Sequence, residues 1–279
     1  DIRDEVFQIL ASLYSDSFDP KVAIQLARRR LDDATSAFGS ADPRIVPAEI
    51  GLADALLTSG DDTEATSLLA HGQSLLDRVG DDSSLIRARL LRWQGILTMV
   101  HRDKTSWQQH PLRRSIELLR ARYPREDELI QALVTLPAEA CRFGHVEEAL
   151  DSADELYRLS VSRYGVDNVY VDSAALVHGQ LLVVDSRAED AIVLLEQAQA
   201  GFKRHLGEKN QNVLLAQLDL SEAYWLAGRR DDSRAIFANV EQAAAADHAG
   251  EKQVEAMLTT TRASLADLAA GKQLHRCGR

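Results

Sequence analysis

The 279-residue chain is poor in the residues that would tie it together covalently or carry it through a membrane. Its two cysteines, Cys141 and Cys277, are too few for the disulfide framework of a small secreted domain. The longest nearly apolar run, residues 174–184, contains His178 and Gln180 and is too short to span a bilayer, so we expect no membrane insertion. Only six prolines are present, and most of them precede regions with a helical pattern.

An excess of positive charge is also missing. The chain has 32 Lys and Arg against 43 Asp and Glu, which gives a formal net charge of -11. A nucleic-acid-binding protein needs a basic face to neutralise phosphates, so this balance argues against direct binding of nucleic acid. The consecutive residues Arg28, Arg29 and Arg30 do not supply such a face, because neighbouring residues of a helix point about 100° apart.

Sequence motifs for catalysis and for metal or cofactor binding are absent as well. The string His101–Asp103 is similar to a kinase catalytic loop, but Gln108 stands where that loop needs Asn, and no Gly-rich phosphate loop accompanies it. The eight histidines form no HExxH motif and no close metal-ligand spacing, and neither GxSxG nor GxxxxGK[ST] occurs. We therefore expect no enzymatic activity, no catalytic residue, no metal and no cofactor.

What the sequence does contain is a regular return of small side chains on a helical pattern. Apolar residues recur three and four positions apart throughout, which predicts an all-α protein. Stepping by 42 residues gives two columns in which five of six members are small. The first column is Ala23, Ala65, Trp107, Ala149, Ala191 and Ser233, and the second is Ala11, Ala53, Gly95, Pro137, Gly179 and Ser221. A looser column of helix-ending glycines is Gly39, Gly80, Gly165, Gly207 and Gly250.

These columns predict an array of two-helix units whose small residues lie where helices approach closely. One unit cannot bury its apolar stripe alone, so the units must stack. We expect a single domain over 1–279 with repeats at 1–39, 40–80, 81–124, 125–165, 166–207 and 208–248, and a capping helix within 249–272. The expected helices are 2–15, 19–37, 43–58, 62–78, 83–101, 111–122, 126–142, 146–163, 168–184, 188–205, 210–227, 231–246 and 251–270.

Two positions break the pattern. Trp107 replaces a small residue, so extra residues must lie in 102–111, between the helices of the third unit. Trp107 could be a recognition tip, although folding back over an apolar stripe is the favoured interpretation. Pro137 falls inside an expected helix, which predicts either a kink or a helix that begins after it.

The repeat resembles the tetratricopeptide repeat (TPR) superfamily. The sixth unit carries its pattern of Leu, small residue, aromatic residue, turn Gly, small residue and aromatic residue in Leu220, Ser221, Tyr224, Gly228, Ser233 and Phe237. The fourth and fifth units match at Leu136, Gly144 and Ala149, and at Gly179, Leu182, Ala191 and Ala198. The 42-residue length is similar to the repeats of kinesin light chains and of C-terminal regions in bacterial signalling proteins.

This resemblance implies a right-handed α-solenoid of about six helix-turn-helix repeats, in which the first helices line a concave groove. Carried over position by position, the groove-lining residues are Arg89, Arg92, Gln131, Arg142, Gln180, Glu222 and Trp225, together with Asp54, Leu57, Met99 and Val183. Arg89 and Arg92 share a helical face and could bind an acidic peptide; the favoured alternative is pairing with nearby acids. Trp225 could anchor a partner or pack against the last helix.

The resemblance therefore implies a non-catalytic module that binds a peptide or a partner protein in its groove. We expect it to be a fragment from the C-terminal regulatory region of a bacterial signalling protein such as a Ser/Thr kinase. The alternative is a receptor domain for a small ligand or a signalling peptide within a transcriptional regulator. A cytoplasmic location is expected, or a periplasmic one if a membrane helix precedes the fragment, and a homodimer is left open.

Overall fold

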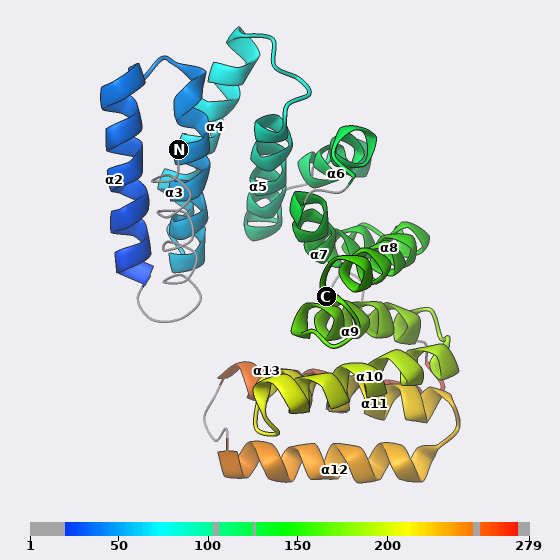
Figure 1. Ribbon diagram of the computed structural model, residues 1–279. Helices are drawn as coiled ribbons and strands as arrows, with labels where there is room; N and C mark the ends of the chain where they lie inside the picture. The colour runs from blue at the N-terminus through cyan, green and yellow to red at the C-terminus, as the bar shows by residue number, and fades with distance from the viewer. Residues whose placement is uncertain (1–19, 103–105, 125–126, 248–251, 273–279) are drawn as a thin grey trace. The chain divides into compact units, whose positions relative to one another are not determined.

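The computed structural model describes residues 20–102, 106–124, 127–247 and 252–272, and these residues are folded almost entirely as helices (Figure 1). Within them lie twelve α-helices, two short 3-10 helices and no strand, which confirms the predicted all-α class. The helix expected at 2–15 lies outside the described residues. The chain forms two compact units, residues 1–132 and 133–279.

In the first unit, each helix from α2 to α5 packs against the next one along the chain. Its elements are α2 (Pro20–Phe38), the 3-10 helix η1 (Pro43–Ile45), α3 (Val46–Ser59), α4 (Asp62–Arg78), α5 (Leu85–His101), the 3-10 helix η2 (Trp107–Gln109), α6 (Pro111–Arg122) and the start of α7 (Asp127–Arg142). Helix α3 also contacts α5, so successive first helices touch, as they do in a helical solenoid.

The second unit is built in the same way. It holds the remainder of α7, then α8 (Val146–Tyr164), α9 (Val169–Val184), α10 (Ala188–Leu206), α11 (Gln211–Leu226), α12 (Arg230–Asp247) and α13 (Lys252–Ala269). Consecutive helices from α8 to α12 pack on one another, and the first helix α9 also contacts the first helix α11. Helix α13 packs on α11, which is the position expected of the last helix.

A left-handed residue ends the first helix of the second to sixth repeats at a constant interval. Gly60, Arg102, Gly144, Ser186 and Gly228 all have positive φ and are 42 residues apart. Each donates its N–H to a carbonyl three residues back, and, where the bond is described, the following residue donates to a carbonyl five residues back. This hydrogen-bond pattern is that of a helix ending in a left-handed C-cap, so the structure carries the 42-residue period in its backbone.

The two columns of small residues lie where helices meet. Ala65, Ala149 and Ala191 are completely buried in second helices, and Ala53 and Ser221 are completely buried in first helices. A Cβ added to Gly95 of α5 would come within 2.5 Å of the Cβ of Leu112 in α6. A Cβ added to Gly179 of α9 would come within 2.7 Å of the Leu195 side chain in α10. The small residues therefore set the distance between the paired helices.

Both predicted irregularities are resolved. Trp107 is buried, and its ring centroid lies 5.4 Å from that of His110. This residue therefore folds back onto the third repeat and does not project into solvent as a recognition tip. Helix α7 runs through Pro137, so the alternative that the helix begins after Pro137 is wrong. Proline removes only its own N–H from the helix, and the other backbone bonds of α7 can form on either side of it.

Candidate partner-binding surface

The first helices α5 and α7 bring together the most concentrated group of predicted site residues. Arg89 and Arg92 lie one turn apart on α5, and Glu128 lies in the first turn of α7. The Nε atoms of Arg89 and Arg92 each lie 2.8 Å from a different carboxylate oxygen of Glu128. Glu128 is buried, so one carboxylate that is removed from water accepts from two guanidinium groups. Pairing with an acid, the favoured interpretation of the arginines, is what the structure shows.

The three charged groups leave a net positive charge at the surface. The Arg92 side chain is only 12% exposed, and its guanidinium carbon lies 4.7 Å from the centre of the Trp93 ring. The Arg89 side chain is 37% exposed. Two cations against one anion give a local excess of one positive charge in a chain whose formal net charge is -11. Glu128 thus holds both guanidinium groups in fixed positions while Arg89 stays accessible to solvent.

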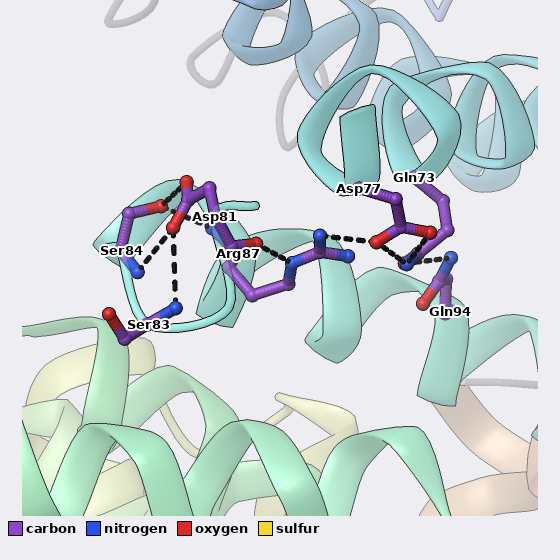
Figure 2. A network of polar contacts seen from close by, with 7 residues as sticks. All are labelled: Gln73, Asp77, Asp81, Ser83, Ser84, Arg87 and Gln94. Carbon is purple, nitrogen blue, oxygen red and sulfur yellow. Dashed lines mark hydrogen bonds and ion pairs between the residues drawn. The ribbon is translucent and has the colours of Figure 1, made fainter. Parts of the chain in front are cut away.

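A polar network on another side of α5 fixes this helix to the end of α4 (Figure 2). The guanidinium of buried Arg87 donates to the Asp81 carbonyl at 2.8 Å and contacts the Asp77 carboxylate at 2.6 Å. The Ser84 side chain accepts from the Arg87 N–H at 3.0 Å and so caps the start of α5. The hydrogen bond from Gln73 and the contact with Arg87 lower the pKa of Asp77. This network was not foreseen, although the sequence Asp81–Ser84 before an apolar helix is a typical helix-start signal.

Two further predicted residues lie on α7. Gln131 is exposed and lies one turn after Glu128 on α7. Arg142, at the other end of α7, donates from Nε to Glu139 at 2.9 Å, and its guanidinium carbon lies 4.4 Å from the centre of the Phe143 ring. That hydrogen bond with Glu139 raises the pKa of Arg142.

The predicted residues of the second unit are less accessible. Gln180 of α9 donates from Nε2 to the Asp219 carboxylate of α11 at 2.7 Å, and Asp219 is buried. Glu222 lies one turn after Asp219 and has no exposed surface at all. A partner approaching this surface would therefore meet Gln180 before it could meet Glu222.

Trp225 is half-buried near the end of α11 and is contacted by the following helix. The guanidinium carbons of Arg230 and Arg234 lie 5.3 Å and 5.9 Å from the centre of its ring. Both arginines belong to the first turns of α12. Contacts of this kind between guanidinium groups and an aromatic face are attractive. They fix the indole, and its role as a partner anchor stays a prediction.

No group of three or more His, Cys, Asp or Glu side chains suited to a metal ion occurs among the described residues. Within the same residues, no helix combines the length and the apolar character needed to cross a membrane.

The stacked helical hairpins, whose turns recur every 42 residues, define a TPR-like helical repeat fold. BtubC (BKLC) from P. vanneervenii has a similar structure, with a TM-score of 0.61, 18% identity, and coverage of 84% of this chain and 94% of that chain. NprR in complex with its cognate peptide NprX is also similar, with a TM-score of 0.56, 13% identity, and coverage of 93% of this chain and 71% of that chain. A putative kinesin light chain with nearly identical TPR-like repeats, from Podosopora anserina, aligns with a TM-score of 0.37, 16% identity, and coverage of 87% and 95%.

No protein-family model matches the sequence, and no curated protein matches it either. The structural likeness therefore establishes the fold alone.

Proposed function

We propose that this chain is a non-catalytic interaction module that binds a peptide or an extended segment of a partner protein along its first helices. The fold supports this proposal, because stacked helical hairpins present an extended surface to a partner. NprR, which shares the fold, is in complex with a peptide. Our candidates remain Arg89, Arg92, Gln131, Arg142, Gln180, Glu222 and Trp225 from the sequence analysis. Among them, Arg89 is the most important and Glu222 is the least accessible.

The observation that carries the proposal is the arginine pair on Glu128. A guanidinium that is already oriented by a buried carboxylate loses little freedom when a second anion binds, and such preorganisation favours binding. Arginine is also the residue best suited to recognise a carboxylate through several hydrogen bonds. We infer that the partner segment is acidic near this point, and that Gln131 contributes a neutral hydrogen-bonding group beside it.

We propose further that the module is the regulatory region of a larger signalling protein, with a Ser/Thr kinase as the leading parent. The second candidate is a receptor domain that responds to a small ligand or a signalling peptide, and the NprR–NprX complex favours the peptide form of this candidate. A receptor ligand present at a hundredfold excess over its dissociation constant would stabilise the fold by about 2.7 kcal/mol. At the same ligand concentration, a weakly bound docking partner would give a much smaller shift in melting temperature.

Binding of labelled peptides, measured by fluorescence anisotropy, tests the proposal. The probes are a 12-residue peptide rich in Glu and Leu and a matched peptide in which Lys replaces each Glu. We expect the acidic peptide to bind more tightly, and Arg89→Gln to weaken it about tenfold by removing one charge-assisted hydrogen bond. Arg28→Gln is the control, because Arg28 is also partly exposed and ion-paired, to Glu64 on α4. Equal binding of both peptides, or equal weakening by the two variants, would contradict the proposed site.

A further inference from the structure

A buried acid of the second unit is held by a histidine from the neighbouring helix. Asp172, in the first turn of α9, is 1% exposed, and its Oδ2 lies 2.8 Å from Nδ1 of His205 near the end of α10. The other oxygen, Oδ1, is buried without a hydrogen-bond partner. The contact joins the start of the first helix to the end of the second helix, at the end of the hairpin opposite the Ser186 turn.

A glycine makes room for this carboxylate. A Cβ added to Gly201 of α10 would lie 2.0 Å from Oδ1 of Asp172, so only glycine allows the acid to pack there. The packing keeps water away from Oδ1, and a buried carboxylate is costly unless its charge is compensated. His205 is the group placed to compensate it.

The second nitrogen of His205 faces another acid. Its Nε2 lies 3.3 Å from Oδ1 of Asp167, in the turn before α9, and Arg204 contacts the same Asp167 oxygen at 3.0 Å. A neutral imidazole can donate from only one nitrogen, whereas the protonated ring donates from both. Both ring nitrogens of His205 therefore face a carboxylate oxygen. The charged groups that act on Asp172 are His205 and Arg204 from α10 and Asp167 from the turn before α9.

The first unit contains an independent pair of the same kind. Oε1 of Glu49 in α3 lies 2.5 Å from Nδ1 of His71 in α4, and Glu49 is buried. Its Oε2 lacks a hydrogen-bond partner and would lie 3.2 Å from a Cβ added to Gly72. His71 is the charged group that acts on Glu49. In both units, a buried acid on the first helix thus packs against a glycine of the second helix and is hydrogen-bonded by a histidine of that helix.

We infer that these two acid–histidine pairs are pH-sensitive clasps, which hold α9 to α10 and α3 to α4 and weaken as the pH rises. At higher pH the acid is a buried anion, which burial disfavours, and the adjoining turns open more often. At lower pH a proton held within the acid–histidine pair removes this cost, and the hairpin stays closed.

The acids themselves point in the same direction. Burial raises the pKa of Asp172, although the hydrogen bond from His205 acts against it, and burial likewise raises the pKa of Glu49 against the effect of His71. A carboxyl group whose folded pKa is raised contributes stability that is present below its unfolded pKa and is lost as the pH rises through the folded value. Rising pH therefore weakens both clasps.

Hydrogen exchange measured by mass spectrometry on the whole chain, at pH 6 and pH 8 and corrected for the intrinsic rate, tests the inference. We expect the protection factor of segment 166–176 to fall about tenfold from pH 6 to pH 8, that is, by about 1.4 kcal/mol in opening free energy. In Asp172→Asn the fall should shrink to less than twofold. If that variant does not fold, His205→Gln should lower the protection of segment 166–176 at pH 8, because it removes the hydrogen bond to buried Asp172.

The exposed pair His101–Asp62, with Nε2 and Oδ2 3.0 Å apart, supplies the matched control. In Asp62→Asn, the pH dependence of segment 166–176 should equal that of the unaltered chain. The inference is overturned if segment 166–176 shows no fall in the unaltered chain. It is also overturned if the fall persists in Asp172→Asn, or if His205→Gln leaves the protection at pH 8 unchanged.

Discussion

Arg89 of α5 and Glu128 of α7 are 39 residues apart in the sequence and are joined at 2.8 Å. Gln180 of α9 and Asp219 of α11 repeat this relationship, with the same separation of 39 residues and a distance of 2.7 Å. The separation is one 42-residue unit less one helical turn, so each pair connects successive first helices. Residues predicted to face a partner thus also hold the first helices together, and substitutions there will affect both binding and stability.

Removal of the Glu128 charge should be costly. Glu128→Gln leaves Arg92 largely buried without its counter-charge, and we expect a loss of about 2–3 kcal/mol in the free energy of unfolding. Arg89→Gln should cost about 1 kcal/mol or less, because Arg89 is more exposed. Urea unfolding of the two single variants and of the double variant measures these losses in the free energy of unfolding. Strictly additive losses would show that the Arg89–Glu128 contact contributes nothing.

The left-handed position at Ser186 offers a stabilising substitution. Ser186 has φ of 61°, whereas Gly60, Gly144 and Gly228 occupy the equivalent position in other units. Ser186→Gly should relieve the left-handed strain and raise the free energy of unfolding by about 0.5–1 kcal/mol. Gly144→Ala is the reverse test: a Cβ at Gly144 would meet nothing within 4 Å, so its expected loss of about 1 kcal/mol comes from φ alone. Unchanged urea midpoints in both variants would contradict this interpretation.

The contact at Gly95 should not tolerate a methyl group. An added Cβ would lie 2.7 Å from the backbone nitrogen of Leu112, so α5 and α6 would have to separate, and we expect Gly95→Ala to cost about 1–3 kcal/mol. Gly51→Ala is the matched control, because the nearest atom to its Cβ is Nη1 of Arg30 at 3.7 Å. This control should gain about 0.5–1 kcal/mol from helix propensity. Similar melting temperatures for the two variants would refute the role assigned to Gly95.

His178 should give a pH dependence of the opposite sign to the clasps. Burial lowers the pKa of His178, with Asp154 of α8 and Asp190 of α10 acting against it and Arg187 with it. A histidine with a lowered folded pKa stabilises the fold above its unfolded value near pH 6.5, and this stability is lost as the pH falls through the folded value. The unaltered chain should therefore lose more stability than His178→Gln between pH 7.5 and pH 5, as measured by thermal unfolding. Equal losses would show that His178 titrates freely in the folded state.

The helices could be predicted from the sequence because their signals are local. Helices α4 and α6 have the predicted bounds 62–78 and 111–122, and the other described helices differ from prediction by three residues or fewer at each end. The spacing of apolar residues and the columns of small residues can be recognised within one or two repeats of the sequence. The left-handed column was only partly visible, because Arg102 and Ser186 replace the glycine that normally marks such a position.

The candidate site was less predictable. Arg89 and Arg92 could be placed on one helical face from the sequence. Their shared acceptor Glu128 belongs to the next repeat. Its burial depends on how α5 and α7 are rotated about their own axes, which the sequence does not give. Glu222 illustrates the same limit, because its position in the repeat pointed to the surface and the packing of α11 covers it completely. Predicting which side chains pair between successive repeats requires knowing how the helices are aligned in three dimensions.

Deletion of residues 187–228 tests most directly whether the fold is an array with a 42-residue register. The deletion joins Ser186 to Arg229, which has the same surroundings as Arg187: Arg187 pairs with Asp190 and Arg229 pairs with Asp232, both three residues on. We predict a shortened chain with unchanged helicity per residue and a cooperative urea transition, whereas deletion of the 38 residues 187–224 should abolish the cooperative transition. Loss of cooperative folding in the first deletion, or its survival in both, would contradict the account.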